Sequence, residues 1–290
     1  MSSLKHELAF LKRRNRVACV TAACVFGILF TCAAEAQQAG DKEIQIGWVR
    51  AQALDSNTSI HTDLNPSLGN TLLGVPNSFN TYGISTHART VNTLAFNSVY
   101  FLTDHFSLEL DAGVPPKVAI QGMGIAAPPG PSGMLFRVNL GDPALNPLGS
   151  SLQWSPVLAL QYLFGNTTSR LRPFIGAGIT YTWFTHMHLN PAFEQAINTN
   201  FGQPLAVAAG KPGPTSVDAS VDPVWEPAYK LGISWEVSRH WGVTGSTTYI
   251  PYATTTAALL KAADGTTLAT NQAKITVDAL GISVLLSYRF

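Results

Sequence analysis

Apolar and polar side chains alternate along most of the chain, which is the pattern of a half-exposed β-strand. The alternation is clear in the C-terminal segment 280–290, where Ile282, Val284 and Leu286 share one face, and Ser283 and Ser287 share the other. The same period of two recurs along the chain after residue 42. It predicts eight strands, at residues 43–50, 91–101, 105–114, 152–164, 171–184, 225–237, 241–250 and 280–290.

The two faces of these strands indicate a membrane barrel rather than a soluble sandwich. The polar face is rich in Gly, Ser and Thr, which suits a crowded lumen, and all six tryptophans lie on the apolar face, mostly near strand ends. Aromatic residues at strand ends are typical of the girdles of outer-membrane barrels. The sequence therefore predicts an all-β fold, an eight-stranded antiparallel transmembrane β-barrel.

The connections between the predicted strands alternate in length. Long segments span about 51–90, 115–150, 185–224 and 253–273, whereas the intervening turns at 103–105, 165–170 and 238–240 are short. Outer-membrane barrels have long extracellular loops and short periplasmic turns. Both chain ends should then lie on the periplasmic side.

Residues 1–36 are predicted to be a cleaved secretory signal peptide, and 37–290 a single barrel domain. A basic stretch at 12–16 precedes an apolar run, and Ala34-Glu35-Ala36 forms an A-x-A cleavage pattern. An uncleaved anchor is the alternative. The three cysteines all lie in this segment, so a disulfide-stapled secreted domain is excluded.

Charge narrows the choice of partners. Only 12% of the residues are charged and the formal net charge is +1, which excludes a nucleic-acid binder held by phosphate contacts. No metal site is assigned, because His186 and His188 have no evident third ligand. No catalytic residue is assigned, because no nucleophile-elbow or triad motif is visible. No cofactor is assigned either.

Three segments resemble the OmpW family of bacterial outer-membrane proteins. Residues 172–181 (R-P-F-I-G-A-G-I-T-Y) resemble its R-P-Y/F-x-G-A-G-x-x-Y segment, and 156–165 resemble its P-x-L-x-x-x-Y-x-F-G strand. The ending at 286–290 resembles its G-Y-R-F terminus, although Leu-Ser stands where Gly is common. The resemblance implies an outer-membrane barrel with a narrow apolar channel that passes small hydrophobic compounds, with an exit sideways through the wall. An alkane-import branch belongs to the same family.

Three sets of candidate residues follow from these patterns. Two prolines that cannot donate to a sheet ladder, and the apolar loop that follows them, are candidates for a lateral gate or hydrophobic path. Inward ionisable side chains should pair as a plug of the lumen, because unpaired buried charge is costly. The sets are Pro115, Pro116, Ile120, Met123, Met134 and Phe136 for the path, Glu109, Asp111, Glu226, Lys230, Glu236 and Arg289 for the plug, and Tyr288 and Phe290 for an assembly signal.

The path set has a plainer alternative, in which the prolines only end a strand and the loop residues pack on one another as a cap. The plug set could instead form an ion path.

The function we expect is passive transport of small hydrophobic molecules across the outer membrane. The partners are outer-membrane lipids, small hydrophobic solutes and the barrel-assembly machinery. The alternatives are a non-conducting structural or receptor barrel at the cell surface and, less favoured, a lipid-modifying enzyme.

Overall fold

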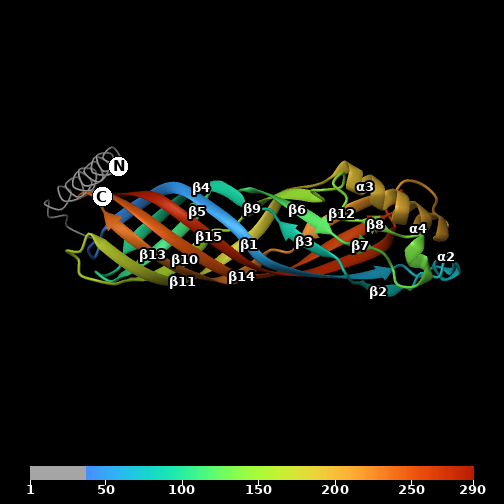
Figure 1. The fold of residues 1–290 in the computed structure, drawn as a ribbon, viewed down its shortest axis with the longest axis horizontal. Helices are drawn as coiled ribbons and strands as arrows, with labels where there is room; N and C mark the ends of the chain where they lie inside the picture. The colour runs from blue at the N-terminus through green and yellow to red at the C-terminus, as the bar shows by residue number, and fades with distance from the viewer. Residues whose placement is uncertain (1–36) are drawn as a thin grey trace, which may run out of the picture.

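A computed structural model describes residues 37–290 as a long barrel with helices at one end only (Figure 1). The predicted signal peptide, residues 1–36, lies outside the described residues. The strands and helices are β1 (Lys42–Leu64), α2 (Leu68–Leu72), β2 (Ser78–Thr81), β3 (Ser85–Ala88), β4 (Val91–Phe101), β5 (Phe106–Gly113), β6 (Lys117–Met123), β7 (Ile125–Ala126), η1 (Pro131–Met134), β8 (Val138–Asn139), β9 (Gly149–Trp154), β10 (Val157–Leu163), β11 (Leu171–Leu189), α3 (Pro191–Ile197), η2 (Asn198–Gly202), α4 (Gln203–Ala208), β12 (Ser216–Val221), β13 (Val224–Glu236), β14 (Trp241–Lys261) and β15 (Thr267–Arg289).

Eight strands close into a ring, as the alternation predicts. The order around the ring is β1, β4, β5, β10, β11, β13, β14 and β15, and each strand is antiparallel to its neighbours. The first and last strands close the ring through a long ladder from Glu43↔Arg289 to Leu64↔Ala269. A closed ring leaves no strand edge unpaired in lipid, which is the requirement for spanning a bilayer with strands.

The apolar face of the strands points outward. Ile282, Val284 and Leu286 are each about half exposed, whereas Leu285 between them is buried in the lumen. Rings of aromatic residues lie near both ends of this outer surface. At the end with the short turns Tyr288 contacts both Trp241 and Phe290, and toward the other end Trp154 stacks on Trp183 with ring centroids 5.7 Å apart. These are the interfacial girdles of a membrane barrel.

Three strands run much further than the alternation predicts. β1 continues to Leu64, β14 continues to Lys261, and β15 already begins at Thr267. The long loop predicted at 253–273 is therefore wrong, because these residues form a hairpin with a short turn at 262–266. Beyond the bilayer the outer face meets water, so outward positions there carry residues such as Lys261 and Gln272 and the apolar alternation fades.

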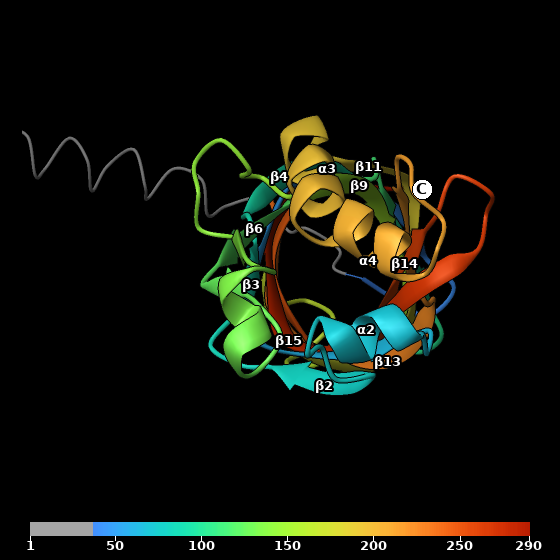
Figure 2. The same cartoon turned by 90° about the vertical axis from the view of Figure 1, so that its right-hand side faces the viewer.

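The predicted loop 115–150 also contains structure, since it holds β6, η1 and two short strands. The predicted loop 185–224 contains a helical segment, residues 191–208, which we call the cap. Viewed from this end, the cap and α2 lie across the mouth of the barrel (Figure 2).

Candidate functional site

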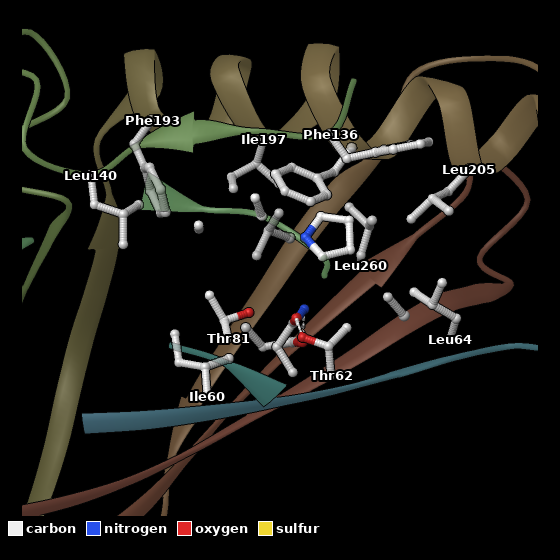
Figure 3. A pocket seen from close by; sticks show the side chains of 18 of the residues that line it. Ile60, Thr62, Leu64, Thr81, Phe136, Leu140, Phe193, Ile197, Leu205 and Leu260 are labelled. Carbon is white, nitrogen blue, oxygen red and sulfur yellow. Dashed lines mark hydrogen bonds between the residues drawn. The ribbon is translucent and has the colours of Figure 1, made fainter. Parts of the chain in front are cut away.

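An apolar cavity of about 210 Å³ lies beneath the cap, in the extracellular half of the barrel. The cap side chains form its roof, and β1, β2, β14 and β15 contribute its floor and walls (Figure 3). None of its described lining residues is ionisable. The volume exceeds the ~150 Å³ cavity that admits benzene and lies below the ~300–1,000 Å³ of drug-sized sites. It suits a single ring or a short chain.

The cap presents one apolar stripe to this cavity. Phe193, Ile197, Phe201 and Leu205 are spaced four residues apart and all line it. In an α-helix each step of four overshoots a full turn by ~40°, so the stripe would drift around the helix. The residues 198–202 form a π turn, which holds more residues per turn and offsets part of that drift.

The start of the cap is set locally by its sequence. Asn190 is the N-cap, its side chain accepts a hydrogen bond from the backbone N–H of Ala192, and Pro191 occupies the first helical position. Both residue types are favoured at these positions. The Asn190 amide also donates to the carbonyls of Leu145 and Pro147, which ties the cap to the segment before β9.

The far side of the cap is held against the segment that leads to β12. Asn198 Oδ1 accepts hydrogen bonds from the backbone N–H and the hydroxyl of Thr215, at 2.9 and 2.6 Å. Gly202 lies against the same threonine so closely that a Cβ there would meet Thr215 Oγ1 at 1.8 Å. This contact therefore requires glycine.

Replacing Gly202 with alanine is expected to loosen the cap without unfolding the barrel. Overpacking of this kind costs ~1–3 kcal/mol, and here it acts on the contact between the cap and residue 215. Hydrogen–deuterium exchange should become faster in residues 191–208 and stay unchanged in β13 and β14. Gly245→Ala is the control, because a Cβ at Gly245 meets nothing within 4 Å. Unchanged exchange of the cap in Gly202→Ala would contradict this assignment.

A surface clasp joins the end of the cap to the β14–β15 turn. Lys211 Nζ donates to Asp264 Oδ2 at 2.6 Å and also to the hydroxyl of Thr266. The hydrogen bond from Lys211 lowers the pKa of Asp264 to about 2, and hydrogen bonds from Thr266 act in the same direction.

This lowered pKa predicts the pH range of the clasp. Because the folded pKa lies below the ordinary value of ~3.9, the clasp is present at neutral pH and is lost as the pH falls toward about 2. An NMR titration of the Asp264 carboxyl should give a midpoint near 2, and Lys211→Gln should return it toward the ordinary value. An ordinary midpoint in the unaltered protein would contradict the clasp.

Below the cavity, ionisable side chains fill the lumen in two groups. In the upper ionic cluster, Lys230 Nζ lies 2.6 Å from Glu109 Oε2 and 2.9 Å from Asp111 Oδ2. Asn97 and Gln161 donate further hydrogen bonds to Glu109, whose side chain is 1% exposed. Three of the six predicted plug residues therefore meet in one buried cluster.

The lower ionic cluster lies nearer the periplasmic end. Arg289 Nη2 lies 3.7 Å from Glu236 Oε2, and Arg289 Nε lies 3.6 Å from Asp41 Oδ2. Two buried ionisable residues of this region, Glu43 and Arg172, were absent from the predicted plug. Their inward position in the alternation was the signal that could have found them.

The barrel wall is interrupted just above the upper ionic cluster, at residues 114–116; we call this the first wall break. The β5–β10 ladder ends at Asp111↔Val157, and the β6–β9 ladder begins only at Lys117↔Leu152. On the other side the β4–β5 ladder ends at Ala95↔Gly113, and pairing resumes between β3 and β6. The two prolines have no N–H to donate here, and the hydrogen bonds that remain run from Val114 N–H to Leu94 O and from Gln153 N–H to Pro116 O.

A second wall break lies between β13 and β14, at residues 222–228. The β13–β14 ladder ends at Tyr229↔Tyr249, and the β12–β14 ladder begins at Val221↔Thr256. Glu226 lies here rather than in either ionic cluster, and its carboxylate accepts a hydrogen bond from the Ala253 backbone N–H at 2.9 Å. Polar groups therefore bridge this break.

The predicted path residues are dispersed. Phe136 is buried and lines the cavity, whereas Ile120 is partly buried in β6. Met123 and Met134 are exposed, so these two side chains do not line the cavity. Pro115 and Pro116 form the first wall break. The residues that sequence reasoning missed are the cap stripe and the extensions of β1 and β14, although the four-residue spacing after Asn190-Pro191 was visible.

The proposed assembly signal lies at the end of β15. The rings of Tyr288 and Phe290 are 5.1 Å apart, and Phe290 is exposed. Its recognition by the barrel-assembly machinery stays a prediction. Among residues 37–290, no helix is long and apolar enough to cross a membrane, and no three metal-ligating side chains are grouped.

Comparison with known proteins fits this architecture. The sequence model of the OmpW family matches residues 62–290. The chain belongs to the OmpW family. Outer membrane protein W of Escherichia coli is 28% identical over 162 residues, which are 56% of this chain and 58% of that protein. The match thus spans little more than half the length of this relative. Outer membrane protein AlkL of Ectopseudomonas oleovorans is 23% identical over 68% of this chain and 66% of its own.

Solved structures show the same fold for this OmpW-family chain. The outer membrane protein OprG from Pseudomonas aeruginosa superposes with a TM-score of 0.63 at 19% identity, covering 89% of this chain and 99% of OprG. AlkL in lipid bilayers superposes with a TM-score of 0.50 at 17% identity, covering 90% and 95%. The protein is therefore an eight-stranded bacterial outer-membrane β-barrel, with the extracellular end at the cap.

Proposed function

We propose that this barrel passes small hydrophobic molecules passively across the outer membrane. The observation that carries the proposal is the apolar cavity beneath the cap, which contains no ionisable residue among its described lining and lies on the cap side of the ionic clusters. An apolar molecule gains free energy by leaving water for such a cavity. Membership of the OmpW family supports the same function.

The exit we propose is lateral, through the first wall break. The upper ionic cluster lies beneath the cavity, and moving an apolar solute through paired charges would break their contacts. Pro115 lies four residues beyond Asp111 toward the extracellular end, so the break opens just above this cluster. Hydrogen bonds cross both breaks, from Val114 N–H to Leu94 O and from Gln153 N–H to Pro116 O at the first, and from Ala253 N–H to Glu226 and from Asp222 N–H to Thr255 O at the second. We favour the first break because its two adjacent prolines have no N–H to add to the ladder.

The structural or receptor barrel remains the competing function, and the ionic clusters are the feature that favours it. Such a barrel needs no apolar cavity above its plug. A solute path does need one, so blocking the cavity separates the two functions.

Replacing Ala258 with phenylalanine is the experiment that tests transport. Ala258 lines the cavity, and its larger replacement should reduce uptake of a labelled medium-chain hydrocarbon by whole cells to the rate of cells that lack the protein. Ala257→Phe is the matched control, because the neighbouring side chain on the same strand points to the other face. Hydrocarbon uptake by a folded Ala258→Phe barrel at the unaltered rate would overturn the proposal.

A further inference from the structure

We propose that the cavity selects apolar molecules that carry one neutral hydrogen-bonding group, such as a short alcohol or a phenol, over hydrocarbons and carboxylates of the same size. This inference rests on the proposed function and concerns the chemistry of the same cavity. It is carried by three of the four polar side chains in the described lining, Thr62, Thr81 and Asn271, which we call the polar corner; the fourth is Thr86. All three line the cavity.

The polar corner comes from three strands that the fold brings side by side. Thr62 on β1 faces Asn271 on β15 in the ladder, and β2 places Thr81 beside Ile60 on the other edge of β1. Thr62 and Thr81 lie on the side of the cavity opposite Phe193, Ile197 and the rest of the cap stripe (Figure 3). A solute in the cavity thus meets an apolar roof and a floor with polar groups at one place.

This corner has unused hydrogen-bonding capacity. Thr62 Oγ1 donates its one proton to Asn271 Oδ1 at 2.8 Å. The Thr62 hydroxyl oxygen can still accept a hydrogen bond from a solute. Asn271 Nδ2 donates to the Ala258 carbonyl at 3.3 Å and has a second N–H. Within residues 37–290 the Thr81 hydroxyl makes no hydrogen bond, although this residue is 8% exposed. The corner therefore offers at least one donor and one acceptor.

An alcohol matches that set, because a hydroxyl both donates and accepts. A hydrocarbon would exclude water from the corner without replacing its hydrogen bonds, which lowers affinity. A carboxylate would bring a charge into a cavity that has no cation among its described lining residues, and a buried charge without a partner is strongly disfavoured. Apolar walls alone would favour the hydrocarbon over the alcohol and would exclude the carboxylate, so the polar corner is what reverses the order of the first two.

Binding of three matched probes tests the inference: 1-hexanol, hexane and hexanoate. The full-length protein, purified from outer membranes and placed in lipid nanodiscs, is titrated while the methyl NMR signals of Ile60 and Leu205 report occupancy of the cavity. The unaltered protein should bind hexanol about tenfold more tightly than hexane, as expected for one net hydrogen bond, after correction for partition into lipid. Hexanoate should leave both signals unchanged.

Thr81→Val keeps the shape of the side chain and removes its hydroxyl, so the preference for hexanol should be lost, with hexanol affinity falling and hexane affinity unchanged or higher. Thr62→Val, a second variant, should lower hexanol affinity in the same selective way. Ser246→Ala is the control, since this lumenal hydroxyl bonds to Ser283 outside the cavity.

Equal binding of hexanol and hexane by the unaltered protein would overturn the inference but would not contradict the proposed transport of hydrophobic molecules. Selective hexanol binding that survives both threonine substitutions would also overturn it. If no probe shifts the methyl signals of Ile60 and Leu205, the cavity does not bind these solutes, which contradicts the proposed function itself.

Discussion

Replacing Val284 with arginine is expected to lower the free energy of unfolding in phospholipid vesicles by about 2–4 kcal/mol, the cost of arginine on the lipid face of a barrel near mid-bilayer. Val284 lies on the outer surface of β15, half exposed, between Trp48 on β1 and Gly245 on β14. It is six residues from the periplasmic end of the chain, within the apolar belt. The measurement is equilibrium unfolding in urea.

Leu72→Arg is the matched control for this substitution. Leu72 is 88% exposed, but it lies on α2 at the extracellular mouth, outside the apolar belt. A surface change there should stay within about 0.5 kcal/mol. Equal tolerance of arginine at Val284 and at Leu72 would contradict the placement of the bilayer.

Replacing Lys230 with methionine should cost about 3–5 kcal/mol, because it removes the cation that pairs with two neighbouring carboxylates in the lumen. Lys230 lies between Glu109 and Asp111, and the side chains of Lys230 and Glu109 are both almost fully buried. Adding Glu109→Gln to this variant should restore part of the loss, since the double variant leaves one acidic group fewer without a cation. The free energy of unfolding is again the quantity measured.

The control is an ion pair of the same length in water. Lys261 Nζ lies 2.6 Å from Asp218 Oδ2, as Lys230 Nζ does from Glu109, but both of its side chains are substantially exposed. Lys261→Met should therefore cost less than about 1 kcal/mol. Similar losses for Lys230→Met and Lys261→Met would show that the upper ionic cluster is hydrated rather than buried.

The membrane part of the fold could be predicted because the bilayer imposes a period of two. Lipid outside favours apolar side chains and the lumen favours small or polar ones, so successive residues alternate. The predicted segments 91–101 and 225–237 therefore match β4 and β13 within one residue. Above the bilayer the outer face meets water, and the alternation of apolar and polar residues is no longer required. The threonine- and alanine-rich run after Tyr252 is strand all the same, because it pairs along its length with β15.

The candidate site was only partly predictable for a related reason. Alternation shows that Glu109, Asp111 and Lys230 point inward, but not that Glu226 lies higher, where the ladder to β14 is broken. The height of a residue depends on strand register, which a single strand does not reveal. The cavity was missed because its roof is helical, so its stripe has a spacing of four within a segment otherwise rich in loop residues.

The central claim is that hydrophobic solutes, rather than ions, cross this barrel. Its most direct test reconstitutes the purified full-length protein and records, on one preparation, the uptake of a labelled medium-chain hydrocarbon and the single-channel ion conductance. The account predicts hydrocarbon uptake with little ion conductance, because the cavity is apolar and the ionic clusters close the lumen below it. Steady ion conductance without hydrocarbon uptake would contradict it.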